Sequence, residues 1–235
     1  CAFSHSLVRS LTMAPVLGYW DIRGLAQPIR LLLAHVDEKY EDKRYSCGPP
    51  PDFDRSAWLK DKPNLGLDFP NLPYWIDGDV KITQSTAILR YLARKHGLEG
   101  KTDAEKLRTD LAEQQWCDFR MAFVRLCYNP DFDKLKDEYL SALPASLKAF
   151  SDFLGKHKFF AGENLTHVDF IAYEMLAQHL LFAPDCLKDY ASLKDFVARV
   201  EALPKVAAYM KTDKFLSWPC NGDMAKFGSR LTKKP

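Results

Sequence analysis

The segment Leu65–Ser85 restricts the fold of this chain more than any other part of its sequence. Two short apolar runs in it, Tyr74–Ile76 and Val80–Thr83, flank an Asp-Gly-Asp tripeptide, which is typical of a tight β-hairpin turn. Asn71-Leu72-Pro73 precedes the hairpin, and Gln84-Ser85 stands where the second strand gives way to a helical pattern. The backbone at both places can face an extended ligand, so the segment predicts a hairpin with a small-peptide site at its two ends.

The rest of the N-terminal half alternates strands with helices. Val16–Trp20 and Tyr40–Tyr45 have the length and residue types of short strands. Ser46–Ala57 contains three consecutive prolines and is predicted to be a loop, because proline neither donates to a strand ladder nor continues a helix. Helical spacing is shown by Ile29, Leu32, Leu33 and Val36 after Pro28, and by Ile88, Leu89 and Leu92 before Gly97, a residue suited to a left-handed helix end.

Beyond Gly100 the pattern is helical throughout. Pairs of a hydroxyl residue and a carboxylate three positions later mark two helix starts, because they satisfy N–H groups that a helix leaves free. The predicted helical segments are Thr102–Tyr128, a segment from Pro144 that Gly155 ends, Phe170–Leu181 after the cap Thr166–Asp169, and Leu193–Leu203. The predicted organisation is therefore one α/β domain over residues 13–97, a linker over 98–101 and an all-helical domain over 102–230.

The charge balance excludes several classes of partner. The chain has 33 basic and 31 acidic side chains, a net charge of +2, and the two signs are interspersed. Proteins that bind nucleic acids or membrane surfaces concentrate Lys and Arg, and a membrane span needs about 20 apolar residues in a row, which this sequence lacks. We therefore expect a soluble, cytoplasmic protein that binds neither nucleic acid nor membrane.

Cysteine and histidine spacing predicts no metal site. The six cysteines lie far apart without a Cys-x-x-Cys pair, and the six histidines form no His-Glu-x-x-His motif. Most of the thiols are expected to be buried or inert. The sequence also lacks the Gly-x-Ser-x-Gly, Walker A and Gly-x-Gly-x-x-Gly motifs.

Several motifs together resemble one family. LGYWDIRG around Tyr19, the NLPY and TQS of the hairpin segment, and YSCGPPPDFDRSAW at Tyr45–Trp58 closely resemble the glutathione transferases of the mu class. The resemblance covers Met13–Arg230 and implies a thioredoxin-like N-terminal domain of order βαβαββα, with a mixed four-stranded sheet, followed by a C-terminal helical bundle domain. Residues 1–12 and the tail 231–235 lie outside it. Met13 is the expected natural start, and the first twelve residues lack the order of a secretory signal.

This resemblance implies a homodimeric enzyme that activates the thiol of glutathione as a thiolate and conjugates it to hydrophobic electrophiles. Glutathione is the co-substrate, and no cofactor is expected. Since the thioredoxin-like half lacks a Cys-x-x-Cys pair, it is expected to bind a thiol peptide without disulfide exchange. Two other functions stay open: a carrier of apolar ligands without turnover, and a structural protein like the lens crystallins derived from transferases.

Tyr19 is the expected catalytic residue, because its position in LGYWDIRG matches the tyrosine of the mu-class motif. A free thiol has a pKa of about 8.5 and is mostly protonated at neutral pH, and each unit of depression is worth about 1.4 kcal/mol. A neutral phenol that donates a hydrogen bond to sulfur can supply part of this stabilisation. The alternative is a core tyrosine at a strand end.

Two backbone sites in the hairpin segment are expected to hold glutathione. Pro73 is predicted to follow a cis bond, so that the N–H and C=O of Leu72 pair with the cysteinyl unit as a strand would; otherwise Pro73 is an ordinary loop proline. Gln84 and Ser85 open a helix whose free N–H groups favour an anion, here the γ-glutamyl carboxylate. Ser85 as a plain N-cap is the alternative, and it is compatible with ligand binding.

Arg55, Trp58 and Lys62 follow the proline loop at spacings that share one face of a helix. Their cations and indole N–H suit the glycyl carboxylate of glutathione, and the alternative is a solvated basic face. The resemblance makes Trp58 and Lys62 glutathione ligands, with Asn71 close by and Arg55 less certain, and adds Trp20.

Two residues are expected to contact a second copy of the chain. By itself Asp118 is an acid facing solvent, but the resemblance assigns it to the γ-glutamyl ammonium of glutathione in the partner subunit. Phe69 matches the mu-class aromatic residue that inserts into the neighbouring subunit, the alternative being an ordinary core residue.

The electrophile pocket is assigned by resemblance, with Tyr128 expected to donate a proton or hydrogen bond to a developing oxyanion, as when an epoxide opens. A core aromatic is the alternative. Asn221 and Gly222 stand where mu enzymes often carry an apolar or aromatic residue, and predict a more polar, mobile lid. The expected lining is Trp20, Ile22, Leu25, Met121, Val124, Tyr128 and Asn221.

Overall fold

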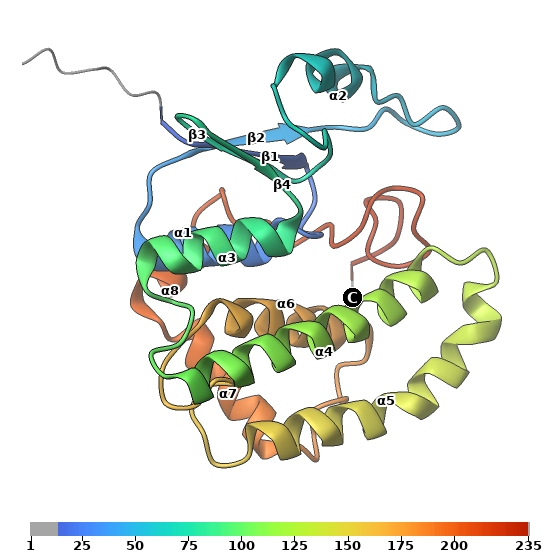
Figure 1. Ribbon diagram of the computed structural model, residues 1–235. Helices are drawn as coiled ribbons and strands as arrows, with labels where there is room; N and C mark the ends of the chain where they lie inside the picture. Colours follow the sequence, from blue (N-terminus) through green and yellow to red (C-terminus); the bar gives the residue numbers. More distant parts are fainter. Residues whose placement is uncertain (1–13, 235) are drawn as a thin grey trace, which may run out of the picture.

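A computed structural model describes residues 14–234 (Figure 1). Its sheet has four strands in the order β2-β1-β3-β4. β1 (Val16–Trp20) pairs in parallel with β2 (Glu41–Tyr45) and antiparallel with β3 (Tyr74–Asp77), which forms the predicted hairpin with β4 (Val80–Thr83). The parallel pair is joined by a helical crossover, as parallel strands require. The mixed four-stranded sheet expected from the sequence is confirmed.

Helices cover both faces of this sheet. Figure 1 shows α1 (Gln27–Val36) and α3 (Ser85–His96) on the face toward the helical domain, and α2 (Ser56–Asp61) on the opposite side. α3 ends at Gly97, whose φ of 70° is the left-handed conformation predicted for it. The last two residues of the predicted proline loop, Ser56 and Ala57, already belong to α2.

The second domain contains five long or medium helices around a buried centre. The predicted capping box opens the first of them: Glu105 N–H donates to Thr102 Oγ1 at 3.1 Å, and Thr102 N–H donates to Glu105 Oε2 at 3.3 Å. The helices are α4 (Asp103–Cys127), α5 (Phe132–Leu154), α6 (His167–Phe182), α7 (Ala191–Glu201) and α8 (Pro204–Met210). α6 is buried on nearly all sides, so it forms the centre of the domain.

One predicted helix start is wrong. Pro144 lies inside α5, which already begins at Phe132. A proline in a helix interior loses one backbone hydrogen bond and costs about 3 kcal/mol. The segment stays helical because Leu143, Leu147 and Phe150 bury an apolar stripe on both sides of the proline, and Phe150 stacks on Trp116 of α4 with ring centroids 3.6 Å apart.

The two domains meet along α1 and α6. Arg23, in the turn after β1, donates two hydrogen bonds to Glu174 of α6, at 3.0 and 2.8 Å, and both side chains are buried. His167, the first residue of α6, donates its backbone N–H to Leu98 in the linker. The N-terminal domain is thereby fixed on the helical domain with the end of β1 near the C-terminal end of α4.

Among residues 14–234, no helix is long and apolar enough to cross a membrane. Within the same range, no group of three or more His, Cys, Asp or Glu side chains is placed to hold a metal ion. The expected N-terminal extension 1–12, the start at Met13 and the final residue of the tail lie outside the described residues.

Candidate active site

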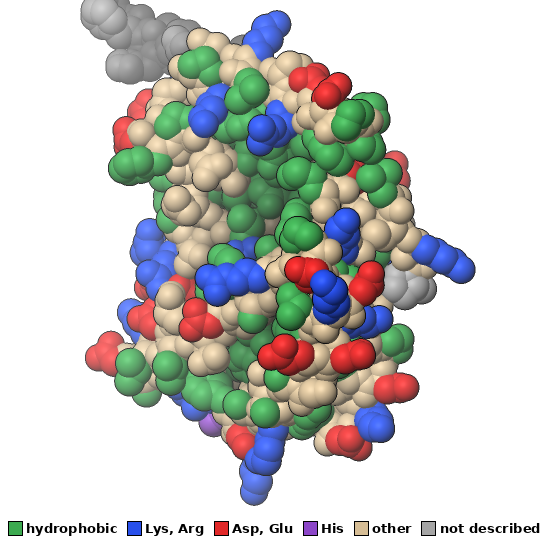
Figure 2. All heavy atoms as spheres, turned by 90° about the vertical axis from the view of Figure 1, so that its right-hand side faces the viewer, with side chains coloured by type: hydrophobic (Ala, Val, Ile, Leu, Met, Phe, Trp, Pro, Cys, Tyr) green, Lys and Arg blue, Asp and Glu red, His purple; other side chains and the backbone are tan. Residues whose placement is uncertain are grey.

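A cavity of about 360 Å³ lies where the two domains meet; we name it the Tyr19 cavity. It is enclosed by the end of β1, the proline loop, the end of α4 and the C-terminal segment 217–230. Figure 2 shows this side of the molecule hollowed between the domains, with hydrophobic side chains in the hollow. Its lining is Tyr19, Trp20, Asp21, Ile22, Tyr45, Cys47, Asp52, Phe53, Arg55, Tyr128, Gly222, Asp223, Met224 and Arg230.

Tyr19 is held with its hydroxyl ready to donate. The hydroxyl oxygen accepts a 3.1 Å hydrogen bond from the backbone N–H of Leu25, so the phenolic proton is left for another acceptor. Gly24 packs against it with a φ of 44°, and a Cβ there would lie 2.7 Å from the hydroxyl oxygen. Burial raises the pKa of Tyr19, which is only 5% exposed, so the phenol stays neutral near pH 7. A neutral donor at this place suits a thiolate.

The turn before β3 has the predicted geometry in part. The Leu72–Pro73 bond is cis, as predicted. The N–H of Leu72 donates to the side chain of Asn71 at 2.9 Å, so a peptide ligand would have to replace this local bond. The backbone of this turn can therefore take a ligand strand once the Asn71 side chain moves aside.

The start of α3 is strained. No side chain among the described residues caps its free backbone N–H groups with a hydrogen bond. Gln84 is the N-cap residue with φ 71° and ψ 111°, a conformation that non-glycine residues rarely adopt. Ser85 is the first helical residue, so the alternative of Ser85 as a plain N-cap does not hold. The free N–H groups of this first turn form a site suited to a carboxylate.

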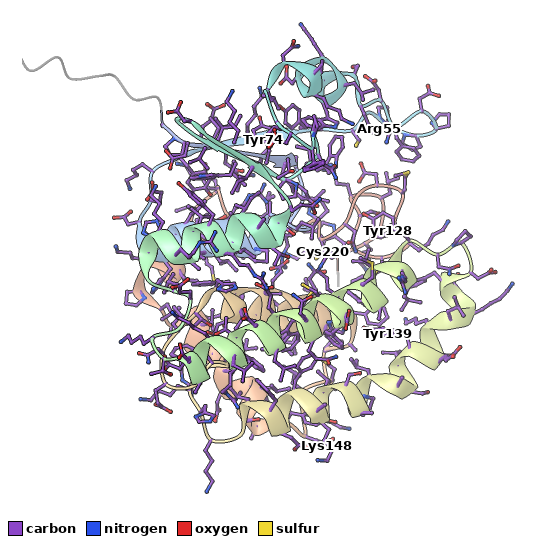
Figure 3. All side chains as sticks on the ribbon, viewed as in Figure 1. Arg55, Tyr74, Tyr128, Tyr139, Lys148 and Cys220 are labelled. Atoms are coloured by element: carbon purple, nitrogen blue, oxygen red, sulfur yellow. The ribbon has the colours of Figure 1, made fainter. Side chains whose placement is uncertain are left out.

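The three residues after the proline loop do not share one helix face. α2 ends at Asp61, and Lys62 begins the 3₁₀ turn η1 (Lys62–Asn64). Trp58 points into the domain and stacks on Tyr74, with ring centroids 6.2 Å apart. Arg55 is exposed and lines the Tyr19 cavity. Figure 3 shows it on the same side of the molecule as Tyr128 of the other domain.

Tyr128 closes the cavity from the helical domain. Its hydroxyl oxygen accepts a 2.7 Å hydrogen bond from the backbone N–H of Gly222, so its proton is also free to donate. Burial raises the pKa of Tyr128 to about 12, which keeps it protonated through neutral pH. The arrangement can therefore donate a hydrogen bond to an oxyanion that develops within the cavity.

The structure brings only part of the expected electrophile pocket together. Trp20, Ile22 and Tyr128 line the Tyr19 cavity, whereas Leu25 lies in a separate small cavity with Ser85. Met121 and Val124 of α4 lie outside both linings.

Asn221 is a correction to the expected lid. Its side chain is 4% exposed and donates to the backbone carbonyl of Phe227 at 3.0 Å. Its neighbours Gly222, Asp223 and Met224 form the wall instead. The segment has no strand or helix periodicity that would tell which residue faces inward, so a one-residue difference was not predictable.

Eight of the cavity residues had no predicted role: Asp21, Tyr45, Cys47, Asp52, Phe53, Asp223, Met224 and Arg230. Arg230 donates to Asp21 Oδ2 at 2.6 Å and lies 3.7 Å from Asp223 Oδ2. Cys47 is one of the five free cysteines in residues 14–234 and is only half-buried, unlike the buried Cys127 and Cys220. Cys47 lies in the proline loop, and Arg230 is the last residue of the segment that resembles the family. Neither segment has a helix or strand periodicity from which the direction of a side chain could be predicted.

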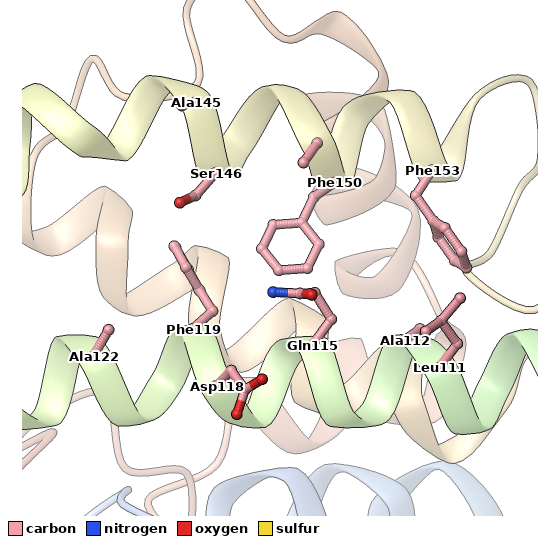
Figure 4. A pocket seen from close by; sticks show the side chains of 11 residues that line it. Leu111, Ala112, Gln115, Asp118, Phe119, Ala122, Ala145, Ser146, Phe150 and Phe153 are labelled. Carbon is pink, nitrogen blue, oxygen red and sulfur yellow. The ribbon is translucent and has the colours of Figure 1, made fainter.

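A groove of about 630 Å³ separates α4 from α5 on another face of the helical domain; we name it the α4–α5 groove. Figure 4 shows Phe119 and Phe150 pointing into it from the two helices, with Asp118 beside them. Phe69, in the loop before β3, is 77% exposed. The alternative of Phe69 as an ordinary core residue is therefore wrong. Asp118 is exposed, as expected of an acid that faces solvent.

A thioredoxin-like sheet, a cis proline before its hairpin, a free helix start after it and a helical domain that closes the cavity together define a protein of the glutathione transferase type. Two family models agree with this class. The model described as glutathione S-transferase, N-terminal domain, matches residues 15–94, and that described as glutathione S-transferase, C-terminal domain, matches residues 117–213.

Similar proteins narrow the class. Glutathione S-transferase Mu 3 of Homo sapiens is 57% identical over 215 residues, 92% of this chain and 96% of that protein. Glutathione S-transferase Mu 1 of Mus musculus is 53% identical over 218 residues, 93% of this chain and 100% of that protein. The chain belongs to the mu class of the glutathione S-transferases.

Solved structures support the same fold. The glutathione S-transferase Blo t 8 superposes with a TM-score of 0.83 at 36% identity, covering 91% of this chain and 99% of that one. A pi-class glutathione S-transferase of Onchocerca volvulus superposes with a TM-score of 0.80 at 32% identity, covering 91% of this chain and 100% of that one. The family and fold class expected from the sequence are confirmed.

Proposed function

We propose that this chain is an active glutathione transferase, in which Tyr19 holds the thiol of glutathione as a thiolate for attack on a hydrophobic electrophile in the Tyr19 cavity. The observation that carries the proposal is the Tyr19 hydroxyl. It lines the cavity, it accepts a hydrogen bond from Leu25, and burial raises its pKa, so that its proton is available to a sulfur anion.

Glutathione would lie along the N-terminal domain. The cis turn at Leu72–Pro73 would pair with its cysteinyl backbone, and the start of α3 at Gln84–Ser85 would bind its γ-glutamyl carboxylate. The remaining ligands proposed for it are Trp20, Arg55, Trp58, Lys62 and Asn71. Of these, the exposed position of Arg55 on the cavity rim suits a carboxylate, whereas the stacked position of Trp58 also serves the domain core.

We expect the conjugation itself to use glutathione as co-substrate and no cofactor. The thiol proton leaves to solvent, the thiolate forms a carbon–sulfur bond, and for a chloronitrobenzene the chloride departs with the electron pair of its bond to carbon. For an epoxide, Tyr128 would donate a hydrogen bond to the alkoxide that forms.

The test compares wild type with Tyr19→Phe in conjugation of a chloronitrobenzene with glutathione. We expect kcat to fall by tens-fold or more, about 2–3 kcal/mol, with glutathione binding largely kept. Equal activity in the two proteins would remove Tyr19 from this role. Absence of turnover in wild type, together with tight binding of apolar dyes, would favour a carrier, and absence of both would favour a structural protein.

We further propose a cytosolic homodimer in which Phe69 of one copy enters the α4–α5 groove of the other. A side chain this exposed and apolar gains by burial, and Ala149, Phe150 and Phe153 offer it an apolar groove. Asp118 lines the same groove, close to where a partner's glutathione ammonium would lie under this proposal.

Sedimentation of Phe69→Glu tests the dimer, with Phe69→Leu as the matched apolar control. We expect monomers for the Glu variant and dimers for the Leu variant. A dimer that persists unchanged in the Glu variant would contradict this placement of Phe69.

A further inference from the structure

The lining of the Tyr19 cavity has more acidic than basic side chains. The carboxylates of Asp21, Asp52 and Asp223 line it together with the guanidinium groups of Arg55 and Arg230. The proposed function assigns Arg55 to a carboxylate of glutathione. The part of the cavity that is left for the electrophile then has three carboxylates and a single guanidinium, that of Arg230.

Arg230 compensates the charge of Asp21 before that of Asp223. Its guanidinium donates to Oδ2 of Asp21 at 2.6 Å, whereas it lies 3.7 Å from Oδ2 of Asp223, too far for a hydrogen bond. Arg44 also lies near Asp21, at 3.6 Å, although its Nε is bound to Asp42 at 2.6 Å. Of the two carboxylates beside Arg230, the one of Asp223 is therefore the less compensated.

The side chain of Asp223 is held in one orientation and is largely withdrawn from water. Its Oδ1 accepts a hydrogen bond from the backbone N–H of Arg230 at 3.2 Å, and only 10% of the side chain is exposed. The preceding residue, Gly222, binds the hydroxyl of Tyr128, so this carboxylate belongs to the wall that closes the cavity. A charge in such a wall is poorly screened, because little water surrounds it.

A thiol on another wall of the cavity responds to this charge. Cys47 lines the cavity from the proline loop, whereas Asp223 lines it from the C-terminal segment. Burial raises the pKa of the Cys47 thiol, the charge of Asp223 raises it further, and the charges of Arg55 and Arg230 oppose the rise. The negative field of Asp223 thus reaches the proline loop, and an electrophile held between these two walls lies within it.

This field distinguishes electrophiles by their charge. An electrophile that brings a carboxylate meets a like charge that is poorly compensated, whereas a neutral one does not and a cationic one is attracted. Specificity against one class of ligand commonly depends on such a repulsive element. The glutathione thiolate also repels an anionic electrophile, but it is present in every variant, so a comparison of variants isolates the effect of Asp223.

We propose that Asp223 is a specificity-determining residue, which makes the Tyr19 cavity favour neutral or cationic hydrophobic electrophiles over those that carry a carboxylate. This inference rests on the proposed function and names its substrate class. The bonds made and broken are those of the conjugation above, and Asp223 transfers no proton.

The test measures kcat/KM for three chloronitrobenzenes that differ in one ring substituent, which is a carboxylate, a carboxamide or a cationic trimethylammoniomethyl group. Each variant is compared with wild type on the same electrophile, so intrinsic reactivity cancels. In Asp223→Asn we expect kcat/KM to rise about three- to tenfold for the carboxylate, to stay within about twofold for the carboxamide and to fall about threefold for the cation. Asp223→Glu, which keeps the charge, should retain the wild-type order.

Asp213→Asn is the matched control, because Asp213 is an exposed aspartate near the same end of the chain and lies outside the lining of the Tyr19 cavity. Its kcat/KM values should match those of wild type for all three electrophiles. In Asp223→Asn, a change by the same factor for all three, or no change for any, would overturn the proposal. Asp223 would then only support the C-terminal segment.

Binding of the reaction products separates this inference from the proposed function. If wild type converts none of the electrophiles, the proposed function fails, and the affinities of the three S-aryl glutathione conjugates, measured by calorimetry, still test Asp223. We expect the same order of charge preference, and affinities that do not depend on the sign of the substituent would overturn the inference. If Asp223→Asn does not fold, Asp223→Glu and Asp223→Gln replace it, since they differ from one another in charge and hardly in shape.

Discussion

The backbone N–H of Gly222 donates a 2.7 Å hydrogen bond to the hydroxyl of Tyr128, which joins the C-terminal segment to the end of α4 over the Tyr19 cavity. A Cβ at position 222 would lie 3.2 Å from that oxygen, closer than side chains usually approach. The absence of a side chain at Gly222 thus allows the bond, and the bond leaves the phenolic proton directed elsewhere.

Tyr128→Phe should therefore impair reactions that develop an oxyanion. With an epoxide as electrophile we expect kcat/KM to fall by about 100-fold, whereas a chloronitrobenzene should be affected much less. Because the pKa of Tyr128 is raised to about 12, wild-type epoxide activity should show no loss from its ionisation up to about pH 10. Steady-state kinetics with the two electrophiles separate the effects. Equal losses with both would mean that the hydroxyl only supports the segment.

Gly222→Ala should act through the same hydroxyl. The added Cβ forces the segment and Tyr128 apart, so we expect epoxide activity to fall by about tenfold and the double variant with Tyr128→Phe to be no worse than Tyr128→Phe alone. Independent, additive losses in the double variant would contradict this coupling.

Arg230 ties the same segment to the loop after Trp20, through its 2.6 Å ion pair with Asp21. Half-exposed ion pairs contribute about 1 kcal/mol or less, so Arg230→Met should unfold at nearly the wild-type temperature. Local opening is easier to detect: limited proteolysis should cut residues 217–230 several-fold faster than in wild type, with fragments identified by mass spectrometry. Lys233→Met, close by in the exposed tail, is the control and should be cut at the wild-type rate.

Much of the N-terminal domain could be predicted because its signals are local. The hairpin turn, the cis Leu72–Pro73 bond and the helix start at Ser85 each follow from a few adjacent residues. Tyr19 could be placed at a strand end for the same reason. Whether its hydroxyl donates or accepts could not be predicted, because that depends on the Leu25 backbone folding back on it.

The remaining cavity walls depend on contacts between distant segments, which residue spacing does not encode. Asp21 and Arg230 meet from opposite ends of the chain. Trp58 was predicted on a ligand-binding face by helical spacing, but α2 is too short for that spacing to apply and the indole turns inward.

A buried charged cluster at the domain junction should set the acid stability of the protein. Glu113 is fully buried, with Arg90 at 2.6 Å and His167 Nε2 at 2.8 Å. Burial raises the pKa of Glu113, but hydrogen bonds from His167 and Arg90 outweigh it and hold the pKa below its ordinary value. A carboxylate with a lowered folded-state pKa contributes stability above its unfolded pKa, and this contribution is lost as the pH falls through the folded value.

Glu113→Gln should consequently destabilise the protein most at neutral pH. Because the Arg90 side chain is 42% exposed, we expect about 2–4 kcal/mol rather than the full value of a buried pair. The difference in free energy of unfolding between variant and wild type should shrink below about pH 4. Urea titrations across pH check this, and a difference that stays constant with pH would exclude the charge of Glu113 as its source.

Pro144 offers a stabilising change, because it lies in the interior of α5 without a backbone N–H to donate. Its carbonyl accepts a 2.8 Å hydrogen bond from the Tyr190 hydroxyl, and Pro144→Ala keeps that acceptor. Alanine gains about 3 kcal/mol in helix propensity, from which the greater freedom of the unfolded chain subtracts up to about 1 kcal/mol, so we expect a net gain of about 2–3 kcal/mol. Chemical denaturation should show the midpoint rising without a change in slope, while Glu138→Ala, an exposed change on the same helix, should shift it by about 0.5 kcal/mol or less. A lower midpoint for Pro144→Ala would mean that the proline ring itself stabilises α5 against its neighbours by more than the missing hydrogen bond costs.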